Sequence, residues 1–193
     1  MQFLIDIWKQ KEFRKFIIVF LLSFAILYYG SLAIIGLTWE GGRYSPFLDK
    51  YFNVISWLRS SLMWGTRHLL SWFGVETYMA NPYNIRQVGG RGIKVVYECV
   101  GYGVISFWTA FVVASAGTWK QKIKWVLGGN LALWTLNIFR FALLLVATNK
   151  GWPIPLGWDH HTWFNLFAYL AIFGMIIWHQ RSISMPKPTN HNV

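Results

Sequence analysis

The side chains that offer chemistry in this sequence are a cysteine, an arginine and a pair of histidines. Cys99 is the only cysteine of the chain, Arg140 lies inside an apolar block, and His160 and His161 are adjacent. A thiolate is a strong nucleophile near neutral pH, and a nearby positive charge raises the thiolate fraction. Arginine keeps its proton and offers directed donors to a developing oxyanion, whereas histidine accepts and donates protons. These residue types are therefore suited to acyl transfer through a thioester.

Four apolar blocks predict the elements that position these side chains. The chain has 55% hydrophobic and only 13% charged residues, whereas soluble domains carry about 25% charged residues. The blocks are separated by charged stretches, and each is long enough to cross most or all of a hydrocarbon core of about 30 Å. We therefore predict an all-α integral membrane protein that forms a single membrane domain over 1–193, with about four transmembrane helices at 16–35, 102–119, 125–146 and 163–178.

Basic residues next to these blocks predict which side of the membrane each end occupies. Lysines and arginines precede the first block, separate the second from the third and follow the fourth, and such residues concentrate on the cytoplasmic side. Both termini are therefore predicted to be cytoplasmic, with the first block kept as an anchor because it lacks a cleavage signal. The same residues account for the net charge of +11, so we expect no nucleic-acid partner.

The region 39–98 is predicted to lie on the exoplasmic side and to begin with an interfacial helix. Within it, 51–73 places most of its large apolar residues on one helical stripe, with Arg59 and Arg67 mostly elsewhere. Such a pattern is typical of a helix that lies on the membrane surface. A spanning helix would place the two arginines near the membrane centre, at a cost of about 2.5–3.5 kcal/mol each.

A small β-hairpin is predicted to follow this interfacial helix. The segments 83–88 and 93–98 flank a Gly-Gly-Arg-Gly turn, and the second segment leads directly into Cys99. Glycine-rich turns between short apolar runs are typical of hairpins. The hairpin and the interfacial helix together predict a small exoplasmic cap.

Helical geometry places the three kinds of reactive side chain at one level. At 1.5 Å per residue, Cys99, Arg140 and His161 lie about 31, 24 and 30 Å from the basic ends of their helices. The three heights are similar, although the helix boundaries follow only from the apolar blocks and the basic residues and not from the reactive side chains. The sequence therefore predicts one site that faces the exoplasmic side.

His161 is the predicted proton carrier of this site, with His160 as the alternative. Adjacent residues of a helix point about 100° apart, so only one of them can face the site. Asn165 and Tyr169 continue from His161 as a polar stripe, which we expect to face the bundle interior. Asp159 is expected to act as the N-cap of this helix and to hold a histidine in the useful tautomer.

Other interpretations of the same residues stay open. A lone cysteine is usually structural, and the Asp-His-His run at 159–161 contains possible metal ligands. We nevertheless expect no metal and no cofactor, because the chain has a single thiol and few acidic residues nearby. In a non-enzymatic membrane scaffold or small-solute permease, Arg140 would pair with Glu98 and Cys99 would only pack. Cys99→Ala separates these alternatives, because a scaffold tolerates the change.

The order and spacing of these residues resemble the exosortase/archaeosortase family. The resemblance rests on Cys99 with Gly101 two residues later, on the Asn-x-x-Arg motif formed by Asn137 and Arg140, and on His161. Each motif lies at the outer end of a successive predicted helix, and the resemblance covers about residues 95 to 178. Two positions differ from the usual family pattern: Val100 replaces a serine, and Asn165 replaces a glycine.

This resemblance implies a membrane-embedded cysteine protease or transpeptidase in the cell membrane of a prokaryote. The implied catalytic residues are Cys99, Arg140 and His161. The implied substrates are secreted proteins with a C-terminal sorting tail, made of a short recognition motif, one transmembrane helix and a basic cluster. The enzyme would cleave near the motif and transfer the protein to a surface acceptor, of membrane lipid or glycan type.

Overall fold

The computed structural model describes residues 10–39, 41–152 and 160–184. These residues form helices joined by short turns, with one small sheet between the third and fourth described helices. The elements in chain order are α2 (Lys11–Leu37), α3 (Pro46–Phe52), α4 (Val54–Trp72), β1 (Thr77–Asn81), β2 (Asn84–Gln87), β3 (Gly92–Lys94), the 3-10 turn η1 (Tyr97–Cys99), α5 (Tyr102–Ala114), α6 (Trp119–Lys150) and α7 (His160–Ser184).

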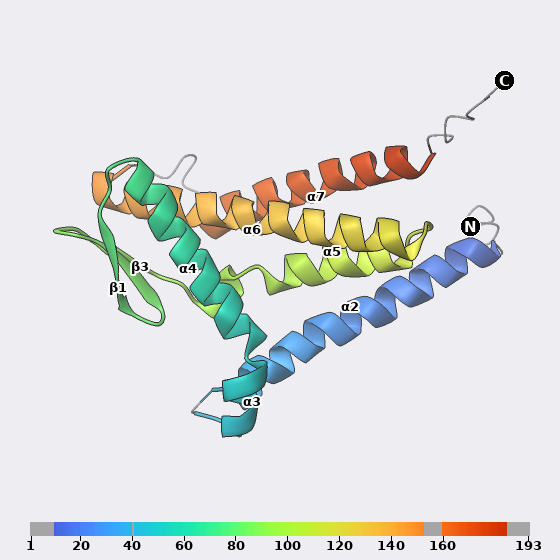
Figure 1. Ribbon diagram of the computed structural model, residues 1–193, viewed down its shortest axis with the longest axis horizontal. Helices are drawn as coiled ribbons and strands as arrows, with labels where there is room; N and C mark the ends of the chain where they lie inside the picture. Colours follow the sequence, from blue (N-terminus) through green and yellow to red (C-terminus); the bar gives the residue numbers. More distant parts are fainter. Residues whose placement is uncertain (1–9, 40, 153–159, 185–193) are drawn as a thin grey trace.

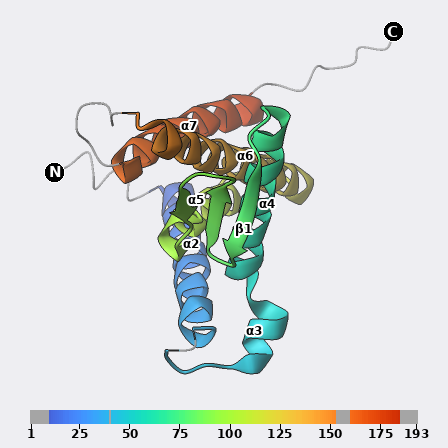
Figure 2. The same cartoon turned by 90° about the vertical axis from the view of Figure 1, so that its left-hand side faces the viewer.

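The helices α2, α5, α6 and α7 form an elongated bundle, which α4 crosses obliquely (Figure 1). The Lys11 end of α2, the turn between α5 and α6, and the Ser184 end of α7 lie at one end of this bundle. The sheet lies at the other end, where it packs against α4 and α6 (Figure 2). The chain segments that the sequence predicts to be cytoplasmic therefore share one end of the molecule.

Three of the described helices are long and apolar enough to cross a membrane, and they confirm the prediction of a helical membrane protein. They are α2, α6 and the segment Asn165–Ile183 of α7. The remaining predicted span, 102–119, corresponds to the short apolar helix α5, which has 13 residues. Its predicted end at residue 119 is wrong, as is the predicted start of the next helix at residue 125.

The early end of α5 is caused by a turn and a helix cap that follow it. Gly117 adopts a φ of 121°, a conformation that L side chains rarely adopt. The hydroxyl of Thr118 then accepts a hydrogen bond from the backbone of Gln121, whose side chain accepts one from the backbone of Thr118. With this capping box, α6 begins at Trp119, six residues before the predicted start, and it has 32 residues in all.

Aromatic rings join α2 to α5. Phe16, Phe20, Phe24 and Tyr28 recur every four residues on α2, so their rings stack along one face of the helix. The rings of Phe20 and Phe24 meet the ring of Phe107 edge to face, with centroids 5.4 and 6.3 Å apart. This ladder holds the N-terminal helix against the helix that follows Cys99 in the chain.

The sheet contains the predicted hairpin and one additional strand. The strands β2 and β3 pair antiparallel, and β1 pairs antiparallel with the other edge of β2. The predicted second segment, 93–98, is wrong after Lys94, because Val95 leaves the sheet and enters the hydrophobic core. The chain then turns into η1, so the sheet ends a few residues before Cys99.

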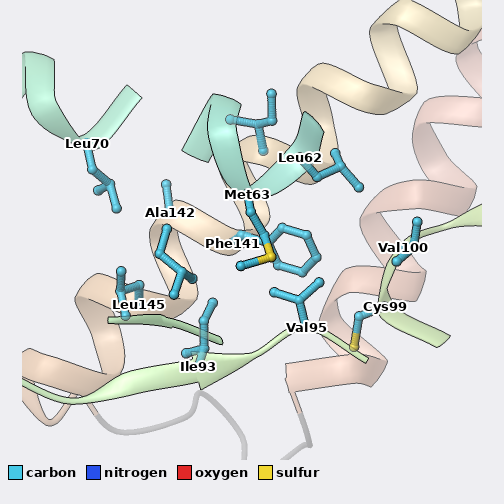
Figure 3. Close-up of a cluster of buried hydrophobic side chains, with 12 residues drawn as sticks. Leu62, Met63, Leu70, Ile93, Val95, Cys99, Val100, Phe141, Ala142 and Leu145 are labelled. Atoms are coloured by element: carbon cyan, nitrogen blue, oxygen red, sulfur yellow. The ribbon is translucent and has the colours of Figure 1, made fainter. Parts of the chain in front are cut away.

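The core at this end of the molecule is formed by α4, α6 and the segment from β3 to α5. Leu62 and Met63 of α4 meet Phe141 of α6 and Val95 in one buried cluster (Figure 3). The sequence pattern places Arg59 mostly off the apolar stripe of α4, and this prediction is wrong. In the structure Arg59 lies on the buried face of the helix and is only 2% exposed. By length and composition α4 is not among the candidate spans of the described residues, and its place at the membrane surface stays a prediction.

Candidate active site

The candidate nucleophile, Cys99, ends a tight turn between the sheet and α5. The turn is closed by hydrogen bonds from the Cys99 backbone to Val96, at 3.0 Å, and from the Val100 backbone to Tyr97, at 3.1 Å. Gly101 follows with a φ of 83° and acts as the N-cap of α5. A side chain is strained in this conformation, which explains why a glycine stands two residues after the cysteine.

The turn buries the Cys99 side chain at the edge of the hydrophobic core. Cys99 is 6% exposed, and its sulfur is turned away from the side chains of Leu62 and Met63 (Figure 3). This placement fits a thiol that has a partner outside the core.

Helix α6 supplies that partner through the Asn-x-x-Arg motif. Asn137 is 3% exposed, and its Nδ2 donates to the carbonyl oxygens of Cys99, at 3.2 Å, and of Val100, at 2.9 Å. Arg140 lies one turn further along, and its Nη1 donates to the same Cys99 oxygen at 3.1 Å. The spacing of three residues places both side chains on one face of α6, where they hold the peptide of the cysteine.

The second terminal nitrogen of Arg140 reaches the thiol itself. Its Nη2 donates to the Sγ of Cys99 across 3.8 Å. The fork shape of the guanidinium lets one side chain contact the sulfur and the carbonyl oxygen together. Cys99, Asn137 and Arg140 are thus brought together, although they are separated by about 40 residues of sequence.

The candidate histidines open α7, and their backbone lies toward the sheet end of the bundle (Figure 1). Asp159, the predicted N-cap, lies outside the described residues. The choice of His161 over His160 therefore stays a prediction. Within the described ranges, no group of three or more histidine, cysteine or acidic side chains is placed to hold a metal ion.

The polar stripe predicted on α7 does not face the bundle interior. Asn165 is exposed and Tyr169 is 63% exposed, whereas Ala168 and Ile172 are buried. The interior face of α7 instead carries Ala168, Ile172 and His179, and the buried His179 ring packs among the rings of Trp108, Phe111 and Trp125. This correction removes the stripe as a reason to prefer His161.

Glu98, the residue that the scaffold interpretation pairs with Arg140, is exposed. The contacts described for Arg140 are with the backbone and sulfur of Cys99, and its guanidinium carbon lies 5.5 Å from the ring centroid of Phe141. The described contacts of this arginine therefore favour a role at the thiol.

Three further residues near Cys99 were not singled out as site residues from the sequence. The guanidinium carbon of Arg59 lies 4.0 Å from the ring centroid of Tyr83 and 5.0 Å from that of Tyr97. The pKa of Tyr83 is raised, chiefly by a hydrogen bond with Tyr97 and by burial, while the charge of Arg59 acts in the opposite direction. A signal was present in the sequence, because Arg59 stands four residues after Ile55 and three before Leu62, on the same face of α4.

The fold and this site together define a helical membrane protein with a thiol held by an Asn-x-x-Arg motif. A sequence model of the transmembrane exosortase family matches residues 11–178, and the chain belongs to this family. At family level it is a membrane sorting transpeptidase. The match confirms the resemblance seen in the motifs and extends it to the N-terminal helix. No curated protein and no solved structure matched the chain.

Proposed function

We propose that this chain is a cysteine transpeptidase whose nucleophile is Cys99. The observation that carries the proposal is the double contact of Arg140, which lies 3.8 Å from the Cys99 sulfur and 3.1 Å from its carbonyl oxygen. Arginine keeps its proton, so a positive charge stands beside the sulfur where a reacting thiolate carries its negative charge. The contact to the carbonyl oxygen and the two hydrogen bonds of Asn137 keep that thiolate in a fixed position.

In the proposed first step the enzyme cleaves the sorting tail of a secreted protein. The Cys99 thiolate attacks the carbonyl carbon of the scissile peptide, a C–S bond forms, and negative charge moves from the sulfur to the carbonyl oxygen. Arg140 stays close to this charge throughout and stabilises the oxyanion. The C–N bond then breaks, and a histidine donates a proton to the departing amine. His161 is the proposed donor and His160 the alternative.

In the proposed second step, an acceptor on the cell surface takes over the acyl group that is bound to Cys99. A hydroxyl group of a lipid or glycan-type acceptor attacks the thioester, the histidine accepts its proton, and a C–O bond forms as the C–S bond breaks. The thiolate returns to its starting state, so the cycle balances without an oxidant, a metal or a cofactor. Water in place of the acceptor would give simple proteolysis.

The proposed location of this reaction is the exoplasmic side of the membrane. Its support is that Cys99 comes just before the first residue of α5, whereas the turn between α5 and α6 follows the opposite end of that helix and lies with the Lys11 end of α2 and the last turn of α7 (Figure 1). Basic residues concentrate on the cytoplasmic side of membrane proteins. A secreted substrate and a surface acceptor are both available on the opposite side.

The test is cleavage of a sorting tail in cells that express Cys99→Ala at the wild-type level. The substrate is a secreted protein from the same genome that ends in a short motif, an apolar helix and basic residues. We expect Cys99→Ala to abolish cleavage, because no other thiol exists in the chain. Ser106→Ala is the matched control, because it removes one atom from a small buried side chain of α5, the helix that follows the turn of Cys99. Continued cleavage by Cys99→Ala would favour the scaffold or permease interpretation.

A further inference from the structure

A buried arginine of α4 lies beside the turn that carries the candidate nucleophile. Arg59 is 2% exposed, and its Nη2 donates to the hydroxyl of Ser56 at 2.9 Å. Its guanidinium lies over the ring of Tyr83 and close to the ring of Tyr97, which begins η1. Tyr97 is two residues before Cys99, so the arginine is joined to the nucleophile through one aromatic ring and one short turn.

The burial of this charge is costly for the fold. The Nε and Nη1 of Arg59 are buried, and neither finds a hydrogen-bond partner among the residues that the structure describes. The two tyrosine rings offer a favourable cation–π environment, yet an apolar side chain of similar volume would fill the space without losing the hydration of a cation. Packing alone therefore does not explain an arginine at this position.

The two rings that contact Arg59 come from opposite ends of the segment that leads to Cys99. The backbone oxygen of Tyr83 accepts a hydrogen bond from Val95 at 2.7 Å, at the point where the chain leaves the sheet. The rings of Tyr83 and Tyr97 meet edge to face, with centroids 6.3 Å apart. Arg59 thus connects α4 with both the beginning of this segment and the turn at its end.

We propose that Arg59 is a positioning residue that holds η1, and with it Cys99, from the α4 side. Asn137 and Arg140 hold the same turn from the α6 side through the carbonyl oxygen of Cys99. The turn that carries the nucleophile is therefore held from both α4 and α6. This inference rests on the proposed role of Cys99 as the nucleophile, and it adds Arg59 as a residue that sets the position of Cys99.

The first test compares Arg59→Met with Arg67→Met, which makes the same change at an exposed position of the same helix. Two rates are measured in isolated membranes: cleavage of the sorting-tail substrate, and alkylation of Cys99 by N-methylmaleimide. We expect Arg59→Met to lower cleavage by about 10–10²-fold, because small misplacements of a nucleophile are costly. We expect alkylation to become faster, because a loosened turn exposes the thiol of Cys99, which is only 6% exposed in the wild-type protein.

These opposite changes distinguish positioning from a general effect on the fold. Thermal melting of the purified protein is measured alongside, and Arg67→Met is expected to match the wild type in all three readouts. Wild-type cleavage by Arg59→Met, or a cleavage loss without faster alkylation, would overturn the inference. If Arg59→Met does not fold, Tyr97→Phe and Tyr97→Leu replace it, because the first keeps the ring and the second removes it.

The pair of tyrosine variants also tests the path through Tyr97. Tyr97→Phe is expected to keep most activity, and Tyr97→Leu to lose it to the same extent as Arg59→Met. The double variant of Arg59→Met and Tyr97→Leu is expected to be no worse than either single change, because both remove one interaction. Independent losses that multiply would contradict the proposal. Cleavage by Cys99→Ala would instead contradict the proposed function itself, so the two failures are distinguishable.

Discussion

Replacing Arg140 with lysine keeps the positive charge but removes the forked shape of the guanidinium. In the structure, Nη1 donates to the carbonyl oxygen of Cys99 at 3.1 Å while Nη2 lies 3.8 Å from its sulfur. A single ammonium group cannot occupy both positions at once. Arg140→Lys is therefore expected to bind substrate normally and to react slowly.

The expected size of the loss follows from the number of contacts that remain. The carbonyl oxygen of Cys99 keeps the amide of Asn137 at 3.2 Å, so the turn stays in place and the loss falls on stabilisation of the reacting charge. Removing one directed donor to such a charge costs about 10²–10³ in turnover, or about 2.7–4 kcal/mol. We expect kcat to fall by this factor with KM nearly unchanged.

The assay is steady-state cleavage of a purified sorting-tail substrate in detergent or nanodiscs, normalised to titrated thiol. Lys124→Arg is the matched control, because it exchanges the same two residue types at an exposed position near the other end of α6. A wild-type kcat for Arg140→Lys would refute the reasoning, since a positive charge without the forked donors would then be sufficient to stabilise the reacting charge. A raised KM with unchanged kcat would move Arg140 from the reaction to substrate binding.

Three further predictions use other parts of the molecule. His161→Ala is expected to abolish cleavage and His160→Ala only to reduce it; the reverse result in matched cells would transfer the proton-carrier role. The single thiol is expected to react with a membrane-impermeant maleimide in intact cells, and a C-terminal tag that proves exoplasmic would reverse the predicted sides. Gly129→Leu is expected to destabilise the protein by about 1–3 kcal/mol in thermal melts, because a side chain there meets Trp108, whereas Gly128→Leu points into open space and should melt like the wild type.

The long apolar blocks and the motif spacing could be predicted from the sequence because they depend on local chain properties. A run of apolar residues long enough for a membrane forms a helix whatever lies around it, which is why α2, α6 and much of α7 were found. The contact between Cys99 and Arg140 was implied by helix heights alone. The height of about 31 Å predicted for Cys99 assumes a continuous helix up to residue 119, whereas α5 ends at Ala114 and is only about 20 Å long.

Other features depend on partners that helix periodicity does not reveal. The position of Arg59 on the same helical face as Ile55 and Leu62 could indicate its burial, but that pattern does not mark the two tyrosine rings that contact its guanidinium, because they come from other parts of the chain. The strand β1 exists because β2 offers it an edge. The cost of polar groups in lipid predicts that Asn165 and Tyr169 face inward, but both are exposed, and Ala168, Ile172 and His179 are the buried residues of α7.

The central claim, that Cys99 carries the substrate as a thioester, is tested most directly by isolating that intermediate. Purified enzyme is mixed with a sorting-tail substrate in the absence of an acceptor, quenched in acid, digested and examined by mass spectrometry. We predict that the N-terminal part of the substrate is attached to the peptide that contains Cys99, and that neutral hydroxylamine releases it. Substrate attached to another residue, or full turnover after complete alkylation of Cys99, would contradict the claim.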